Sequence, residues 1–233
     1  MSLGPTKQLA LDERIINYAL AHTNPLEPIP ALTACRKQTH ALLPDHAEMQ
    51  IDPLQGAFLR LFAAAIATNN PNPIAVEVGT FTGYSAMCLA LGLGKNARVH
   101  CFDISEQYTD HARRFWQQAG LDNTISLTLG DATRTIKDTL PDDRPPTIDI
   151  AFIDADKENY PAYAQLLIPR TRPGGFLLFD NALRSGRVPD PDAQPDPSLE
   201  ATRAINDKLA KDPRVETCLL PLADGINIAR VTG

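Results

Sequence analysis

The segment "IAVEVGTFTGYSAMCLAL", residues 74–91, passes from a short apolar run through two glycines into a helical pattern. Ile74–Gly79 predicts a buried strand, and Tyr84–Leu91 predicts the helix that follows it. Gly79 and Gly83 would let the backbone between them turn sharply and approach a ligand closely. A strand that leads through a tight turn into a helix is the unit from which parallel sheets are built.

The same alternation continues along the chain, which predicts an α/β fold with a mostly parallel sheet covered by helices on both faces. Further strands are expected at Arg98–Asp103, Ile125–Leu129, Ile148–Ile153 and Gly175–Asp180. Helices are expected between them, for example at Glu106–Ala119 and Asn159–Ile168.

Both ends of the chain depart from this alternation. "VETCLLPLADGINIARV", residues 215–231, predicts two antiparallel strands joined by a turn at Ala223-Asp224-Gly225. Apolar residues at helical spacing over 11–20 and 54–66 predict N-terminal helices, with "NPLEPIP" (24–30) as a turn between them. We expect a single domain over 1–233, with a helical segment over 1–70 and the α/β core over 71–233.

Composition narrows the function classes. The net charge is −6 and no Lys/Arg-rich run is present, which argues against a nucleic-acid surface. No apolar stretch reaches the ~18–20 residues of a membrane span, and no secretion signal is visible, so we expect a cytoplasmic protein. The four cysteines are scattered without paired spacing, which predicts free thiols.

Every expected parallel strand carries an acid at or near its end. These acids are Glu77, Asp103, Asp131, Asp154 and Asp180. Ligands of open α/β sheets bind beyond the carboxyl ends of the strands, where Asp103 could take two ribose hydroxyls and Asp131 an adenine amine. Each acid alone could equally be a helix cap or turn residue. Together they indicate an adenosine pocket without basic phosphate-binding residues, which suits S-adenosylmethionine. The glycine spacing of a nicotinamide site is absent.

A second group of polar residues follows the fourth and fifth strands. Asp154 and the pair Asp180-Asn181 offer two carboxylates and an amide oxygen, a hard oxygen set suited to Mg²⁺ or Ca²⁺. Solvated acids with an Asn cap are the alternative interpretation. Lys157 could face the same opening as a base or remain a surface lysine, and Asp156 could be a helix cap or a partner of the site.

The motifs that carry these residues resemble the cation-dependent O-methyltransferases of the caffeoyl-CoA and catechol type. They are "VEVGTFTGYSAMCLAL", "GDAT", "DIAFIDADKENYPAY", "RPGGFLLFDNALRSGRV", "DGINIAR" and the earlier "MQIDPLQGAFLRLF". The resemblance implies a class I methyltransferase, Rossmann-like seven-stranded sheet and commonly a homodimer. It implies methyl transfer from S-adenosylmethionine to a small ortho-dihydroxy aromatic of the catechol, caffeoyl-ester or flavonoid kind.

The resemblance also implies a role for each matching residue. Those that would hold S-adenosylmethionine are Glu77, Gly79, Thr80, Gly83, Ser85, Asp103, Asp131, Ala132 and Asp154. Asp154, Asp180 and Asn181 would bind the divalent cation, which is magnesium first, with calcium or manganese as alternatives. Lys157, with Asp154, would act on the substrate hydroxyl, and Met49 and Arg184 would contact the acceptor.

Two departures from the family pattern concern the acceptor side. Plant members usually carry Trp where this chain has Arg184, and the proline-rich loop Val188–Ser198 could act as a lid. A non-catalytic S-adenosylmethionine-binding protein and an NAD-dependent oxidoreductase remain as alternative functions, since a shared sheet does not fix function.

Overall fold

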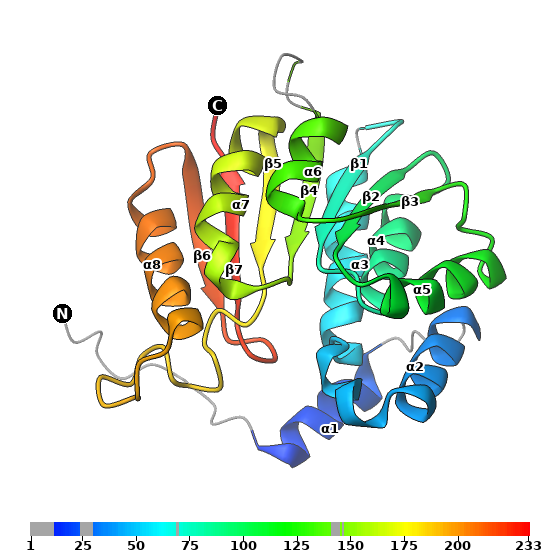
Figure 1. Ribbon diagram of the computed structural model, residues 1–233, viewed down its shortest axis with the longest axis horizontal. Helices are drawn as coiled ribbons and strands as arrows, with labels where there is room; N and C mark the ends of the chain where they lie inside the picture. Colours follow the sequence, from blue (N-terminus) through cyan, green and yellow to red (C-terminus); the bar gives the residue numbers. More distant parts are fainter. Residues whose placement is uncertain (1–11, 24–29, 69, 141–144, 146) are drawn as a thin grey trace.

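The computed structural model describes residues 12–23, 30–68, 70–140, 145 and 147–233. The turn predicted over 24–30 lies outside the described residues except for Pro30, and so do the first eleven residues of the predicted helical segment. Figure 1 shows a single central sheet with helices packed on both of its faces.

The sheet has seven strands in the order β3-β2-β1-β4-β5-β7-β6. Their bounds are β1 Ile74–Val78, β2 Arg98–Asp103, β3 Ile125–Leu129, β4 Ile148–Ile153, β5 Thr171–Phe179, β6 Val215–Leu220 and β7 Ile226–Val231. Strands β1 to β5 pair in parallel, whereas β7 runs antiparallel to both of its neighbours. The predicted Rossmann-like sheet with a C-terminal hairpin is confirmed.

Helices cover the two faces in separate groups. One face carries α2 (Pro30–Leu42), α3 (Pro53–Ala67), α4 (Tyr84–Leu93) and α5 (Glu106–Gln118), while the other carries α6 (Ala132–Thr139), α7 (Tyr160–Leu167) and α8 (Pro197–Lys211). Strand residues alternate between the two cores. Ile150 and Phe152 belong to the first, and Ala151 and Ile153 belong to the second, so β4 is buried on both sides.

The remaining helical elements are shorter or lie at the periphery. Helix α1 (Glu13–His22) has no fully buried residue. The short 3₁₀ segments are η1 (Pro44–Met49), η2 (Lys157–Asn159) and η3 (Ile168–Arg170). Residues of α2 and α3, such as Leu32 and Leu59, are buried in the same core as α4, so the N-terminal segment packs directly on the α/β core.

Several boundaries differ from those expected. Strand β5 begins at Thr171 and not at Gly175, because Thr171 already pairs with Ile148 before a register irregularity. The predicted loop Val188–Ser198 is shorter by two residues, since Asp196 caps α8 and Pro197 is its first residue. A proline at this position is tolerated because the first helical N–H has no partner in any case.

The residues that follow β1, β4 and β5 extend the hydrogen-bonding ladder by one step. The backbone N–H of Gly79 donates to Phe102, that of Asp154 donates to Val78, and that of Asp180 donates to Ile153, over 2.8–3.0 Å. These bonds hold the segments that follow β1, β4 and β5 at one edge of the sheet, where the acids of the sequence motifs meet.

Candidate active site

A cavity of about 950 Å³ opens at the carboxyl edge of the sheet. Its wall is formed by the residues after β1 to β5, by the turn of the β6–β7 hairpin and by residues 48–55. The sequence-predicted site residues that line it are Met49, Gly79, Thr80, Ser85, Asp103, Asp131, Ala132, Asp154, Lys157, Asp180, Asn181 and Arg184. Glu77 and Gly83 do not line it.

The two glycines of the first loop have different structural tasks. Gly79 has φ +90, and a Cβ there would lie 2.3 Å from the carbonyl oxygen of Asp154. The ends of β1 and β4 can therefore approach each other only because this residue has no side chain. Gly83 is the N-cap residue of α4 with φ +79, and a Cβ there would lie 2.5 Å from Nε1 of Trp116, so it serves helix packing.

Asp103 is held rigidly against the glycine loop. Its Oδ2 accepts from the backbone N–H groups of Thr80 (2.8 Å) and Phe81 (2.9 Å), and its Oδ1 accepts from that of Ser105 (2.8 Å). Each carboxylate oxygen can accept more than one hydrogen bond, so acceptor capacity remains for a ligand.

Asp131 caps α6 and also lies on the cavity wall. It caps α6 by accepting from the backbone N–H and the hydroxyl of Thr133, at 2.9 and 2.7 Å. These bonds lower the pKa of the Asp131 carboxyl and keep it charged. It also lines the cavity next to Ala132, so a capping role does not remove it from the site.

Glu77 lies behind the loop, fully buried on β1. Burial raises the pKa of its carboxyl to about 8. The Sγ of Cys101 donates to its Oε2 over 3.5 Å, while its Oε1 has no hydrogen-bond partner among the described residues. A buried carboxylate oxygen without a donor is costly, and a cationic ligand group beside it would remove that cost.

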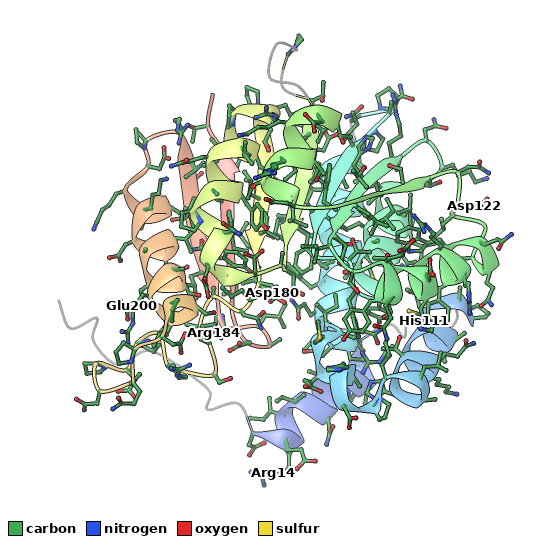
Figure 2. The ribbon with its side chains drawn as sticks, in the orientation of Figure 1. Arg14, His111, Asp122, Asp180, Arg184 and Glu200 are labelled. Atoms are coloured by element: carbon green, nitrogen blue, oxygen red, sulfur yellow. The ribbon has the colours of Figure 1, made fainter. Side chains whose placement is uncertain are left out.

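Asp154, Lys157 and Asp180 form a buried charged group at the ends of β4 and β5. Lys157 Nζ donates to Asp154 Oδ1 over 2.8 Å, and only 11% and 17% of these two side chains are exposed. Burial raises the pKa of Asp180 to about 7, with a further contribution from the charge on Asp154. Burial also raises the pKa of Asp154, against the lowering effect of Lys157. Figure 2 shows Asp180 at this edge of the sheet.

Asn181 and Asp224 connect this group to the hairpin turn. Asn181 Nδ2 donates to Asp224 Oδ2 over 3.0 Å, which leaves Asn181 Oδ1 as the end of the amide available to a ligand. Asp224 also accepts from the backbone N–H of Ser185, so one carboxylate fixes both ends of the turn that follows β5.

These residues fit a hard divalent cation. Asp154, Asp180 and Asn181 supply two carboxylates and an amide oxygen, and two mutually repelling buried acids gain from a positive charge between them. A cluster of three or more His, Cys, Asp or Glu side chains suited to a metal is absent from the described part of the chain. Such a cation would therefore depend on the Asn181 amide and on oxygens from water or ligand.

Four functional neighbours were not expected from the sequence. Gln55 donates to Asp180 over 2.8 Å, and Gln50 donates to the hydroxyls of Thr39 and Thr82, which joins the N-terminal segment to the glycine loop. The other two are Asp224 and Tyr163. Tyr163 donates to Asp156 over 2.6 Å, so Asp156 is a partner of α7 and makes no side-chain capping bond. The sequence signal that could have identified such neighbours is a polar residue within an otherwise apolar stretch.

The proline-rich loop Val188–Ser198, which the sequence suggested as a lid, contributes no residue to the cavity wall. Residues 188–198 are absent from the cavity wall, and Arg203 of α8 donates to the backbone carbonyls of Arg187, Val188 and Asp190. This part of the loop is fastened to α8 and does not cover the site.

Comparison with known proteins gives consistent matches over nearly the whole chain. A family model described as O-methyltransferase matches residues 26–232. "Probable caffeoyl-CoA O-methyltransferase 2" of Dictyostelium discoideum is 37% identical over 92% of this chain and 90% of its own length. Caffeoyl-CoA O-methyltransferase 1 of Eucalyptus globulus is 33% identical over 76% of this chain and 72% of its own.

A solved structure agrees with these sequence matches. The O-methyltransferase from Bacillus cereus in complex with SAH is 30% identical, with a TM-score of 0.82 over 94% of this chain and 97% of that one. In the parts of the chain that the structure describes, no helix has the length and apolar character needed to cross a membrane.

Proposed function

Because the chain belongs to the O-methyltransferase family and is an S-adenosylmethionine-dependent enzyme that methylates a phenolic acceptor, we propose that its acceptor is a small ortho-dihydroxy aromatic and that the transfer requires a divalent cation. The observation that carries the proposal is the joint position of Asp154, Asp180, Asn181 and Lys157 on the wall of one cavity that the donor-side acids also line. Because the chain belongs to this family, the two alternative functions, a non-catalytic S-adenosylmethionine-binding protein and an NAD-dependent oxidoreductase, are no longer supported.

The donor would lie along the glycine loop. Asp103 and Asp131 would accept from the ribose hydroxyls and the adenine amine, with Thr80, Ser85 and Ala132 as further contacts. Glu77, which does not line the cavity, would act from behind the loop, where its charged form would favour the cationic amino-acid end of the donor. Gly79 would allow the donor to approach the backbone, while Gly83 would contribute through the start of α4.

Asp154, Asp180 and Asn181 would hold the cation, with magnesium as the first choice and calcium or manganese as alternatives. A divalent cation in this position supplies positive charge that favours the ionised form of a neighbouring hydroxyl. Asp154 would serve both the cation and Lys157, since its Oδ1 already accepts from Nζ and its Oδ2 is not used by that bond.

Lys157 would take the proton of the acceptor hydroxyl as a neutral amine, or stabilise the resulting phenolate as an ammonium group. Its ammonium group is anchored by Asp154 and lies 5.1 Å from the centre of the Tyr160 ring, which restricts where Nζ can move. The phenolate oxygen would then attack the methyl carbon, the S–CH₃ bond would break, and the sulfonium would leave as a neutral thioether. Because opposite charges are neutralised along this path, the low exposure of these side chains favours the transfer.

The relatives support the acceptor class only by their names, which specify caffeoyl-CoA as the substrate of those proteins. Met49, half-exposed at the end of η1, and Arg184 both line the cavity and would contact the acceptor. A flexible apolar thioether together with a cation suits an aromatic ring with a polar substituent.

The assembly and location are also proposals. A homodimer is supported by the apolar outer surface of α3, where Leu61 is 63% exposed beside half-buried Phe58 and Phe62. Sedimentation should show a dimer that Leu61→Glu converts to a monomer. A cytoplasmic location is supported by three buried free thiols, Cys35, Cys88 and Cys101, which a reducing compartment would preserve.

The experiment that tests the reaction is metal removal. Purified enzyme with S-adenosylmethionine and a catechol should yield a methyl ether that EDTA abolishes and added Mg²⁺ restores, measured by mass spectrometry of the product. EDTA already saturated with Mg²⁺ is the matched control for effects of the chelator itself. Undiminished turnover in EDTA would contradict the metal requirement, and absence of any catechol ether would contradict the acceptor class.

A further inference from the structure

Arg184 lines the cavity and lies in a turn that hydrogen bonds hold in place. Arg184 and Ser185 have φ of +49 and +54, a region that residues with a Cβ rarely adopt. The turn is held by the hairpin, because the carbonyl of Asp224 accepts from the backbone N–H of Leu183 over 2.9 Å and its carboxylate accepts from Ser185. In Figure 2, Arg184 lies on the segment just beyond the sheet edge that carries Asp180.

The guanidinium of Arg184 has no hydrogen-bonding partner within the described ranges of the chain. Among the residues that the structure describes it makes neither an ion pair nor a side-chain hydrogen bond, and its Nε is shielded from solvent without an acceptor. An arginine offers five N–H donors and stays charged at all relevant pH values. A shielded donor without an acceptor costs free energy, so the site is incomplete as it stands.

The charged groups around it are already engaged. Lys157, the other cation on the cavity wall, is paired with Asp154. The carboxylate of Asp224 accepts from Asn181 and Ser185, and Asp196 of the following loop is paired with Arg187 at 2.7 Å. The free positive charge is therefore directed at whatever occupies the cavity.

We propose that Arg184 binds a carboxylate on the acceptor, so that the preferred substrate is an ortho-dihydroxy aromatic acid and not the corresponding ester or amine. This inference rests on the proposed function, since it selects among ortho-dihydroxy acceptors. The planar guanidinium fork matches a carboxylate with two parallel N–H···O bonds, which a neutral ester cannot accept with equal strength. Arg184, at the position where plant members usually carry tryptophan, thus exchanges ring stacking for charge recognition.

The test compares three acceptors that differ only in the end group of the side chain: 3,4-dihydroxyphenylpropionate, its methyl ester and dopamine. Wild-type kcat/KM should be about 10–100-fold higher for the acid than for the ester. Arg184→Gln should lower the value for the acid to that of the ester and leave the ester within about twofold, mainly through KM, because the contact is the same in ground and transition states. Arg184→Lys should retain part of the preference, since it keeps the charge and loses the fork.

Arg113→Gln, on the exposed side of α5, is the matched control and should leave all three values unchanged. Thermal unfolding and S-adenosylmethionine binding confirm that each variant is folded. Equal use of acid and ester by the wild type, or an equal loss for both in Arg184→Gln, would overturn the inference and leave the proposed function intact. If the wild type methylated none of the three, the proposed function would fail and the inference with it.

Discussion

Gln55 Nε2 donates a hydrogen bond of 2.8 Å to Asp180 Oδ1, which joins two buried side chains that are 125 positions apart in the sequence. Gln55 is itself fixed, because Asp52 caps α3 by accepting from its backbone N–H over 2.9 Å. The bond occupies Oδ1 and leaves Oδ2 of Asp180 for a ligand. Helix α3 thereby sets the direction of the Asp180 carboxylate at the end of β5.

Gln55→Met should weaken binding of the divalent cation about 10–100-fold, the usual cost of losing a group that orients a metal-binding carboxylate. The measurement is titration of the purified protein with Mn²⁺, followed by electron paramagnetic resonance in the absence of acceptor. Gln117→Met, on the exposed face of α5, is the control. Unchanged Mn²⁺ affinity in Gln55→Met would show that Asp180 needs no such support.

Lys157→Met should lower kcat about 10²–10⁴-fold, the range expected when a positioned proton acceptor is removed. The KM for S-adenosylmethionine should change little if Lys157 acts on the acceptor as proposed. Lys137→Met, an exposed residue of α6, is the control in the same single-turnover assay. A wild-type rate in Lys157→Met would remove Lys157 from the chemistry.

Gly79→Ala should be far more damaging than an equivalent change at a glycine with similar φ. Gly94 has φ +93 and open space where a Cβ would lie, so Gly94→Ala should cost about 1–3 kcal/mol for backbone strain alone. Gly79→Ala adds a steric conflict with the Asp154 backbone and should also abolish S-adenosylmethionine binding. Urea unfolding and calorimetric titration measure the two effects. Equal losses at both positions would mean that β1 and β4 can separate without consequence.

Glu77 predicts a pH dependence of stability in the protein without donor. Its pKa rises from an ordinary value of 4.5 to about 8 in the folded state because of burial. The folded protein then binds more protons than the unfolded chain between these values, so the free energy of unfolding should fall as pH rises from about 5 to 8. Glu77→Gln cannot titrate and should lose the part of this slope that Glu77 contributes, while the part from Asp180, whose pKa burial raises to about 7, should remain.

The same series should be repeated with saturating S-adenosylmethionine. If Glu77 faces the cationic end of the donor, binding will favour its charged form and the slope of the wild type will flatten. Cys101, which donates to Glu77, has a pKa raised well above its ordinary value and will not titrate in this range. A wild-type stability that rises with pH relative to Glu77→Gln would show that Glu77 is charged in the free protein.

Arg203→Met should release the loop after β5 from α8 without much effect on turnover. Arg203 donates to three backbone carbonyls of residues 187–190, and removing those bonds should speed amide hydrogen exchange there. Since residues 188–198 do not line the cavity, kcat should stay within about twofold, as for a surface change. A loss of turnover well beyond this would restore a covering role for the loop.

The strands were predictable because each is a short, mainly apolar or β-branched run bounded by turn residues. β2, β3 and β4 begin and end where the sequence indicated, whereas β5 was placed too late because Pro173 and Gly174 interrupt its pattern. Pro173 is exposed, which is compatible with a strand residue that donates no ladder bond. α8 was missed because its capping Asp196 and first-turn Pro197 lie within a proline-rich segment.

The acids of the site were predictable for a topological reason, since parallel strands bring their carboxyl ends to one edge. The residues that orient these acids could not be predicted from the sequence. Gln55 reaches Asp180 from the N-terminal segment, and Asp224 reaches Asn181 from a turn 43 positions later. No local pattern connects such partners, because their contact depends on how α3 and the hairpin pack against the finished sheet.

Strand β7 lies inside the sheet between β5 and β6, yet it is synthesised after every other strand. Until it inserts, β5 has an open edge, and the turn that follows β5 lacks the carbonyls of Asp224 and Gly225 that receive its N–H groups. A nascent chain halted before residue 220 can therefore form the cavity wall that follows β1 to β4, but not the turn that carries Asn181 and Arg184. Catalytic competence should appear late and abruptly during translation, and the exposed edge of β5 is where a chaperone would be needed.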